Sequence, residues 1–530
     1  MSRGLSDDRG SNCPEVIIVG SGPAGVSAAW PLLEAGVAVT MIDAASETPL
    51  PSPPRGDVGC FRRDPSRWEV QFSRNFSALE LAGDQSPKLT TPLGRQVLAG
   101  FATTMGLQVR DFLALGSLSR GGLSNIWGAV AAVYDDEDLA DSPVRQADLR
   151  PSYAAVMQRI GVSGSPGADG LPVEEGPSLT APAQRLLNAA SRSSPRRGFV
   201  LERTTNAVLM SARSGREPCA RCGMCLWGCQ RHSIYASGLE VPQLCRFPHF
   251  RYLGGALVRR LLPHDKGHAL EIGGKTVNML LCAPRILLAA GTIATTALVL
   301  RRLGFTGSTR LLTNPASVMA FMMPALFAGP LPKQSFALGQ LTYRLPLRDG
   351  GRATGVIYGA DALPLAGIAA RFPISRPAAL RLARALAPSL LLAICYLPGR
   401  FSANTLRVAD NGDQRQIIIE GTQTEETRGT LLAAGRRLAR KMRHLGAFAL
   451  PGSLTILQPG ADAHYAGTLP MGGDGPTACA PTGELKACPG LYIADGAVLS
   501  SLPAKHCTLT IMANADRIAR HLAARILSER

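Results

Sequence analysis

The first clear pattern of apolar and polar positions lies near the N-terminus and predicts a strand, a helix and a second strand. Residues 15–19 form an apolar run into a glycine-rich turn, and residues 26–33 carry the small side chains of a closely packed helix. A second apolar run, residues 37–42, ends at Asp43. The turn has the spacing G-x-G-x-x-G, formed by Gly20, Gly22 and Gly25. This order predicts a unit that binds a dinucleotide.

Each part of this fingerprint has a physical task. Gly20 permits the tight turn, Gly22 lets the backbone approach a pyrophosphate, and Gly25 allows the helix to pack closely on the strand. The N-terminus of the helix offers amide donors to the phosphates. Asp43, at the end of the second strand, accepts from a ribose hydroxyl.

Similar patterns return in the middle and at the end of the chain. Residues 285–300 read as an apolar strand followed by a helix, and residues 491–494 form a strand that leads to Asp495 and Gly496. A last helix begins near Thr508 and continues to the C-terminus. We expect these pieces to complete one α/β core of Rossmann type, built from segments far apart in the sequence.

Two regions between these segments have a different character. They contain Pro, Gly and Ser clusters, strand-like runs at 353–358 and 416–420, and a helix from 424 to 445 whose acidic start and basic end suit the helix dipole. We expect two insertions into the α/β core, which the family resemblance given below implies to be an α+β substrate domain containing an antiparallel sheet. The predicted division gives 12–135, 201–311 and 452–530 to the discontinuous nucleotide-binding domain, and 136–200 and 312–451 to the substrate domain.

Composition narrows the choice of partner and location. The 530 residues carry a net charge of +17, but aromatic residues make up only 5% and no nucleic-acid motif is found, so we expect no nucleic acid partner. The N-terminus lacks the apolar core of a secretory signal, and the most apolar runs, 319–331 and 390–397, are shorter than the roughly 20 residues of a membrane span. We therefore expect a cytoplasmic protein without a transmembrane helix. Peripheral contact with the cytoplasmic face of a membrane is kept as an alternative, because residues 377–387 form a basic, otherwise apolar helix.

Four of the twelve cysteines lie close together, spaced C-x2-C-x2-C-x3-C: Cys219, Cys222, Cys225 and Cys229. This spacing equals that of the ferredoxin-type run, whose thiolates hold an iron-sulfur cluster. The usual proline after the fourth cysteine is replaced by Gln230. Zinc is a second alternative, although its C-x2-C pairs are normally separated by a longer spacer. Structural thiols without a metal are the third.

Five motifs together resemble the glucose-methanol-choline (GMC) oxidoreductase family of FAD enzymes. They are the N-terminal fingerprint, GGLSNIWG at 121–128, LLAAGTIATT at 287–296, HxxGT at 464–468 and LYIADGAVLSSLPAKH at 491–506. The motifs occur in the family's order and reach both ends of the chain. The resemblance implies a Rossmann-like FAD-binding domain with the inserted substrate domain described above.

The same resemblance implies roles for particular residues. Gly20, Gly22, Gly25 and Asp43 would hold the adenosine diphosphate of FAD, and Val258 would meet the adenine. Another group would lie along the flavin, pyrophosphate and ribityl chain: Gly122, Ser124, Asn125, Asp495 and Gly496. Some relatives attach the flavin through a histidine at the position that Ile126 occupies here, so we expect non-covalent FAD. His464 and His506 would stand over the reactive face of the ring.

These assignments predict an FAD-dependent oxidoreductase that oxidises a CH-OH group by transferring hydride to flavin N5. An imidazole accepts the alcohol proton at neutral pH, and a second imidazole stabilises the forming alkoxide, so His464 is the expected base and His506 its partner. The expected substrate is a sugar, polyol or glycosylated intermediate. The alternatives are a lipid-like or sterol alcohol, which an apolar pocket would favour, and a flavin-binding electron-transfer subunit without alcohol oxidation. Some sugar dehydrogenases of this family carry an iron-sulfur centre, which would deliver electrons to a carrier protein or a quinone.

Overall fold

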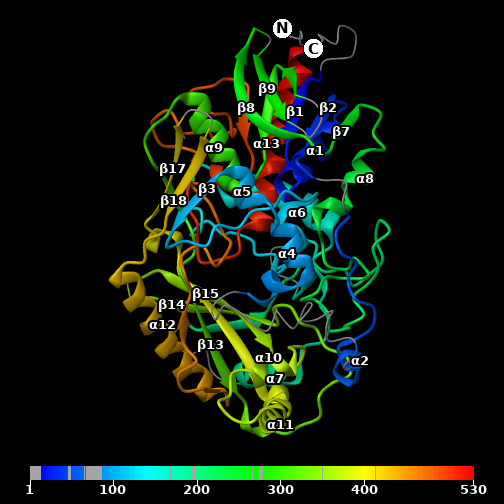
Figure 1. Ribbon diagram of the computed structural model, residues 1–530, viewed down its shortest axis with the longest axis vertical. Coiled ribbons are helices and arrows are strands. Elements are labelled where there is room, and N and C mark those ends of the chain that lie inside the picture. The colour runs from blue at the N-terminus through cyan, green and yellow to red at the C-terminus, as the bar shows by residue number, and fades with distance from the viewer. Residues whose placement is uncertain are drawn as a thin grey trace.

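The computed structural model describes most of the chain, namely residues 14–45, 49–64, 66, 86–165, 170–192, 198–265, 267–273, 278–348, 350–411 and 414–530. Figure 1 shows an elongated molecule with both termini at one end. A parallel sheet lies in the half that holds the termini, and an antiparallel sheet lies in the other half.

The parallel sheet is the nucleotide-binding core that the sequence predicts. Its strands are ordered β21-β11-β1-β2-β7, and every neighbouring pair is parallel. Their bounds are β1 Val16–Val19, β2 Val39–Ile42, β7 Phe250–Leu253, β11 Arg285–Leu288 and β21 Leu491–Ile493. All residues of β1 are buried, as expected for a central strand covered on both faces. The Rossmann-type α/β core is confirmed.

Helices and a small sheet cover this core. The helices are α1 Pro23–Glu34, α9 Thr292–Leu303 and the C-terminal α13 Thr508–Glu529. Leu32 of α1 and Ile518 of α13 share one apolar cluster with Ile18 of β1. The other face packs with Val299 of α9 and with a three-stranded antiparallel sheet. That sheet comprises β8 Leu257–His264, β9 Gly267–Gly273 and β10 Asn278–Ala283.

The antiparallel sheet of the other half is also confirmed. It has seven strands in the order β19-β13-β16-β15-β14-β6, with β20 paired to β13. Their bounds are β6 Val200–Arg203, β13 Ala316–Met322, β14 Leu341–Pro346, β15 Arg352–Gly359, β16 Leu390–Tyr396, β19 Phe448–Ala449 and β20 Thr455–Ile456. Side chains on one face, such as Leu391 and Ala393, pack against α12 Glu425–His444 and α7 Ala181–Ser191. The opposite face of this sheet lines a cavity.

A four-stranded sheet lies beside α9. Its order is β12-β17-β18-β3, with bounds β3 Leu107–Arg110, β12 Thr309–Leu311, β17 Asn404–Asn411 and β18 Gln414–Glu420. The remaining α-helices and strands are α2 Val58–Arg63, α4 Pro92–Leu98, α5 Phe101–Met105, α6 Gln146–Ile160, α8 Val241–Leu244, α10 Leu365–Ala369, α11 Arg376–Leu386, β4 Ser163–Gly164 and β5 Glu174–Glu175. Among the helices of the described ranges, none combines the length and apolar character that a membrane span needs.

Gly254 and Gly255 separate β7 from β8, which belong to different sheets. Two strands pair with strands of another predicted domain segment. β6 pairs with β14 of the antiparallel sheet, although all of β6 except Val200 lies in the predicted nucleotide-binding segment 201–311. β18 pairs with β3, which comes from the first predicted segment. The predicted domain boundaries themselves stay a prediction, and residues 12 and 13 lie outside the described ranges.

Candidate active site

A cavity of about 1230 Å³ extends from the parallel sheet to the antiparallel sheet. Its lining includes the glycine turn after β1, the loop at 115–130, the N-terminus of α9 and the segments that carry His464 and His506. The free face of β16 lines its other end. The cavity therefore joins the predicted nucleotide site, the two histidines and the substrate sheet in one space.

The three fingerprint glycines differ in what surrounds them. Gly20 has φ +104°, and a Cβ there would lie 2.5 Å from Ala289 O. A Cβ on Gly25 would lie 1.9 Å from Gly20 O, so this glycine is needed for helix packing. Gly22 lines the cavity, and a Cβ there would meet no atom within 4 Å. The turn thus leaves open space at the N-terminus of α1, which is where a pyrophosphate binds in such units.

Asp43 lies at the edge of the same space. Its Oδ2 accepts from the Ser21 amide at 2.8 Å, and its Oδ1 accepts from the Ala45 amide at 2.8 Å. Burial raises the pKa of this carboxyl. Val258 lines the cavity on a segment tied to Asp43, because the Ala256 amide donates to Asp43 O at 2.9 Å. These contacts hold a carboxylate where the ribose hydroxyls of a dinucleotide would lie.

The loop at 121–125 is bonded directly to the glycine turn. The Gly121 amide donates to the Ser21 hydroxyl at 3.0 Å. The Ser124 hydroxyl donates to Gly121 O, and it accepts from the Ser237 amide at 3.0 Å. Gly122, Ser124 and Ile126 line the cavity. Asn125 supports the loop instead, since its side-chain amide donates to Gly122 O at 2.8 Å.

Asp495 joins two elements at the N-terminus of α9. Its Oδ2 accepts from the Gly291 amide at 2.9 Å and from the Thr295 hydroxyl, and its Oδ1 accepts from the Ala497 amide at 3.0 Å. Burial raises the pKa of Asp495 to about 6. Asp495 and Gly496 both line the cavity, together with the open turn at Gly291. Of the residues predicted to hold FAD, all but Gly25 and Asn125 line this one cavity, and its open glycine positions fit the group.

His464 and His506 come together, although they lie 42 positions apart in the sequence. Their ring centroids lie 4.9 Å apart with an interplanar angle of 73°. Tyr396, the last residue of β16, contacts both rings, with centroid distances of 5.5 Å to His464 and 5.3 Å to His506. Both histidines line the cavity. The predicted pairing of the two imidazoles is what the structure contains.

The hydrogen bonds of Asn314 determine which ring nitrogen of His464 carries the hydrogen. The side-chain NH₂ of Asn314 donates to Leu397 O at 2.8 Å and to Pro503 O at 2.9 Å. Its Oδ1 must therefore face His464 Nδ1, which lies 3.0 Å away. An amide oxygen only accepts, so Nδ1 carries the hydrogen. Nε2 is then the ring nitrogen that accepts a proton.

Burial shifts the pKa values of the titratable side chains at this site and so determines their charge. It lowers the pKa of His464 to about 4 and that of His506 well below its usual value, and the neighbouring His464 contributes to the second shift. Burial also raises the pKa of Asp462 to about 7. Asp462 Oδ2 accepts from the Asn314 amide at 2.7 Å and lies 3.7 Å from His464 Nδ1. Both imidazoles are therefore neutral at neutral pH, as a base and its hydrogen-bonding partner require.

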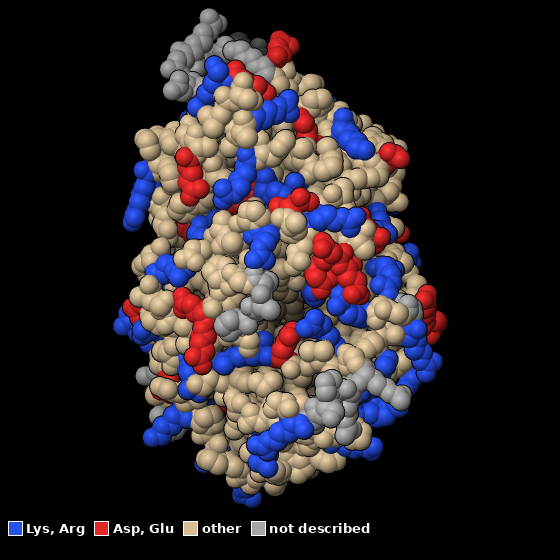
Figure 2. Space-filling model, turned by 180° about the vertical axis from the view of Figure 1, so that it is seen from behind, with Lys and Arg blue, Asp and Glu red and all other residues tan. Residues whose placement is uncertain are grey.

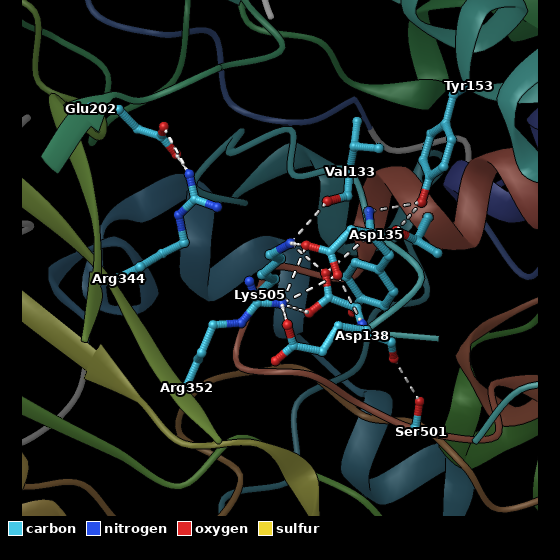
Figure 3. Close-up of polar contacts among 12 residues, drawn as sticks. Val133, Asp135, Asp138, Tyr153, Glu202, Arg344, Arg352, Ser501 and Lys505 are labelled. Atoms are coloured by element: carbon cyan, nitrogen blue, oxygen red, sulfur yellow. Dashed lines mark hydrogen bonds and ion pairs between the residues drawn. The ribbon is translucent and has the colours of Figure 1, made fainter. Parts of the chain in front are cut away.

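Lys505 precedes His506 and anchors its loop, as Figure 3 shows. Its ammonium donates to Asp138, to Asp135 at 3.1 Å and to Val133 O at 3.3 Å. Arg352 of β15 reaches the same acids, 3.2 Å from Asp135 Oδ1. Burial alone would raise the pKa of Asp135, but Lys505 and Arg352 lower it to about 2. The network ties the loop before His506 to both halves of the molecule.

The four clustered cysteines lie on a loop whose neighbours Leu226 and Trp227 line the cavity. Burial raises the pKa of Cys219 to about 11 and raises that of Cys225 further. Cys219 Sγ accepts from the Arg221 amide at 3.4 Å. Within the described residues, no three His, Cys, Asp or Glu side chains are placed to hold a metal ion. The iron-sulfur cluster and the alternative of zinc at Cys219, Cys222, Cys225 and Cys229 both stay predictions.

Comparison with known families agrees with this geometry at both ends of the chain. The model of an FAD binding domain matches residues 14–59, which contain the glycine turn and Asp43. The model of the C-terminal part of GMC oxidoreductases matches residues 400–515, which contain His464, Asp495 and His506. The C-terminal part of the chain, residues 400–515, belongs to the GMC oxidoreductase family.

Individual GMC relatives align over short stretches only. A C-glycoside 3-oxidase from Microbacterium trichothecenolyticum is 40% identical over 76 residues, which are 14% of this chain and 15% of the relative. A C-glycoside 3-oxidase from Arthrobacter globiformis is 40% identical over 75 residues, 14% of either chain. The chain thus matches about a seventh of the length of these curated relatives.

Two solved structures share the GMC fold along nearly the whole chain. Pyridoxine 4-oxidase from Mesorbium loti has a TM-score of 0.62 at 18% identity, covering 96% of this chain and 99% of its own. A formate oxidase variant from Aspergillus oryzae RIB40 has a TM-score of 0.61 at 12% identity, covering 97% and 98%. At such identities the likeness shows the fold alone.

Sequence reasoning missed several residues of this GMC site. Asp462 and Lys505 lie within two positions of the predicted histidines, which was a usable signal. Asn314 and Tyr396 carry no motif, and only the fold brings them to His464. Lys88 also lines the cavity, where its ammonium donates to Trp127 O at 2.5 Å and burial lowers its pKa to about 8.

Proposed function

We propose that this GMC protein is an FAD-dependent oxidoreductase that oxidises a CH-OH group to a carbonyl. The observation that carries the proposal is His464, a neutral imidazole on the cavity wall whose Nδ1 hydrogen is fixed by Asn314. It stands beside a second neutral imidazole, His506, with ring centroids 4.9 Å apart. This arrangement suits the removal of an alcohol proton.

The two histidines divide the work in the proposed reaction. His464 Nε2 takes the hydroxyl proton, while His506 donates a hydrogen bond to the oxygen on which negative charge develops. Bound FAD supplies the acceptor for the hydride that leaves the carbon, its N5 atom. Tyr396 packs against both rings, so the alcohol reaches them from the side that Tyr396 leaves open.

The FAD is proposed to be non-covalent. Ile126 lines the cavity on the loop that follows the glycines at 121 and 122, and its side chain has no group that bonds to a flavin. Acid precipitation is expected to release the yellow cofactor completely into the supernatant. Yellow colour kept in the washed precipitate would contradict this part of the proposal.

The relatives support a sugar-like alcohol as the substrate class. The two aligned relatives are described as C-glycoside 3-oxidases, although each alignment covers about a seventh of the chain. A structural relative is described as a pyridoxine 4-oxidase. A second candidate, an alcohol with a large apolar group, is favoured by the lining of the cavity and is developed in the next subsection.

The test is the anaerobic reduction of the bound flavin by alcohols, followed by its visible absorbance. The wild-type protein is expected to bleach with a suitable alcohol, and His464→Ala is expected to slow the bleaching by roughly 10²- to 10⁴-fold, the usual contribution of a general base. FAD content of each variant is the control for folding. Unchanged bleaching after replacement of both histidines would show that they are not the base and its partner, and a wild-type flavin that no alcohol bleaches would instead support an electron-transfer subunit.

A further inference from the structure

The antiparallel sheet presents a continuous apolar wall to the cavity. Alternate residues of β16 line it, namely Leu390, Leu392, Ile394 and Tyr396, while the residues between them pack against α12 and α7. The register places Val318 of β13 opposite Ile394, and Ala320 of β13 opposite Leu392. On the other side, Tyr358 of β15 pairs with Leu392. The wall is therefore several strands wide.

This wall begins at the reacting centre. Tyr396 contacts His464 and His506, and the strand then runs away from them. At about 3.3 Å per residue, the path from Tyr396 to Leu390 is roughly 20 Å long. Ile368, Phe372 and Leu386 also line the cavity. Figure 1 shows α10 and α11 at the end of the molecule opposite the termini.

Few polar side chains line this path, and a charged one, Arg371, lies beside Phe372 in the lining. Next to β13, in the same sheet, the lining between residues 450 and 457 includes Leu450, Pro451 and Leu457, with Ser453 and Thr455 between them. A sugar buried here would lose hydrogen bonds to water that aliphatic side chains cannot replace. An apolar chain, in contrast, gains free energy from each methylene that it buries.

The geometry points to a substrate alcohol that carries an extended apolar group, with its hydroxyl carbon at His464 and His506 and its apolar group along β16. This inference rests on the proposed function, since it uses the same site and reaction. The oxidised hydroxyl belongs either to a sugar ring with an apolar substituent or to an aliphatic alcohol. In both cases the apolar group is the part that the wall recognises.

The test measures anaerobic flavin reduction with two matched series of alcohols. One series is the primary alcohols from butanol to decanol, and the other compares methyl glucoside with octyl glucoside. The second-order rate constant of reduction is expected to rise by about two- to fourfold for each added methylene in at least one series. A rate that is indifferent to chain length, or fastest with the shortest member of both series, would overturn the inference.

The outcomes distinguish a failure of this inference from a failure of the proposed oxidoreductase function. If short alcohols or methyl glucoside reduce the flavin as fast as the long ones, the oxidoreductase stands and the apolar site fails. If no alcohol of either series reduces the flavin, the proposed function falls and the inference falls with it.

A variant of the wall provides the second measurement. Leu392→Gln is expected to flatten the dependence of rate on chain length, because a buried amide then faces the alkyl chain. Leu392→Met, which keeps an apolar side chain, is expected to retain that dependence. Val109→Gln on β3 is the matched control, since Val109 is half exposed and outside the cavity lining. Equal slopes for Leu392→Gln and the control would overturn the inference, and FAD content verifies that each variant folds.

Discussion

Asn314 decides which nitrogen of His464 carries the hydrogen, so a change at Asn314 should change the acid–base behaviour of the site. In Asn314→Asp, a carboxylate beside Nδ1 favours the imidazolium form and raises the pKa of His464 above its value of about 4. The pH below which flavin reduction slows is expected to rise by about one unit or more. Rapid-mixing measurements of flavin reduction between about pH 4 and pH 8 test this.

Asn314→Leu is the matched control for that experiment. It removes the hydrogen bond to Nδ1 without adding a charge, and it leaves the carbonyls of Leu397 and Pro503 without this donor. We expect a slower reaction and no upward shift of the acid limb. An acid limb that stays in place in Asn314→Asp would show that His464 is not the base.

Asp462 and His464 have opposite effects on stability as pH changes. The folded pKa of Asp462, about 7, is above its ordinary value, so its contribution is present at low pH and is lost as pH rises through about 7. The folded pKa of His464, about 4, is below its ordinary value, so its contribution is present above about pH 6.5 and is lost as pH falls through about 4. The two partly cancel between these limits.

Asp462→Asn should remove that cancellation. Its free energy of unfolding is expected to fall more steeply than that of the wild type as pH is lowered from about 7 to 4, by on the order of 2 kcal/mol over the range. Urea unfolding at several pH values measures it. Parallel profiles for the two proteins would mean that Asp462 is not protonated in the folded state near neutral pH.

At the scale of the elements, two glycines of the turn before α1 have different roles: Gly25 allows helix packing, and Gly22 leaves room for the pyrophosphate. A Cβ at Gly25 would overlap Gly20 O, whereas a Cβ at Gly22 would enter open space on the cavity side. Gly25→Ala is therefore expected to lower the stability of the protein with and without FAD. Gly22→Ala is expected to keep the stability of the FAD-free protein and to weaken FAD binding by about tenfold or more, because the methyl group occupies the approach of the pyrophosphate.

Thermal unfolding and FAD titration of both FAD-free variants test this pair. The glycine roles would be wrong if Gly22→Ala bound FAD as tightly as the wild type. They would also be wrong if Gly25→Ala unfolded at the wild-type temperature.

The loop before His506 is held by charge, and Lys505 is its central residue. Lys505→Met leaves Asp135 and Asp138 partly buried without their main cation, although Arg352 still reaches both. We expect a loss of about 3 kcal/mol in stability, as for breaking a buried ion pair, and a lower rate of flavin reduction at saturating alcohol. Lys505→Arg is expected to recover most of the stability. A wild-type reduction rate in a folded Lys505→Met would show that the network does not position His506.

How much of this could be read from the sequence depends on the separation of the contacting residues. The glycine turn, Asp43, Asp495 and the two histidines lie in contiguous motifs, so their types and spacing indicated their tasks. Asn314 meets His464 across 150 positions, and no local pattern marks it. The apolar runs of β13 and β16 were recognised as apolar. Which alternate residues face the cavity, however, follows only from the helices that cover the opposite face.

At the scale of the whole molecule, the fold was predictable because its parallel core repeats strand-turn-helix patterns. The sheet that each remaining strand joins could not be predicted. β6 joins β14 and β18 joins β3 through pairings between distant segments, which hydrophobic periodicity does not encode. The cavity arises from this division of the strands between sheets, since it lies where the two large sheets meet.

The end of the molecule at α10 and α11 combines exposed apolar and basic side chains. Phe327, Ile374 and Leu380 are 49%, 48% and 38% exposed, and the exposed arginines of α11 lie among them: Arg376, Arg381 and Arg384. In Figure 2 the charged side chains in the lower part of the visible face are mainly Lys and Arg, and they lie among uncharged residues. Exposed apolar groups among basic side chains suit an anionic lipid surface. We therefore predict peripheral membrane contact at this end of the molecule.

Vesicle sedimentation tests this membrane contact. The protein is expected to bind vesicles of equal parts phosphatidylglycerol and phosphatidylcholine, and to bind vesicles of phosphatidylcholine weakly. Arg376→Glu, Arg381→Glu and Arg384→Glu together should reduce binding by roughly 10²-fold or more, since each basic residue near such a surface contributes about 1 kcal/mol. The matched control reverses three exposed arginines of α12, Arg436, Arg440 and Arg443, with the same change in net charge. Equal losses in the two triple variants would mean that the overall positive charge binds lipid, and that the α11 end has no special role.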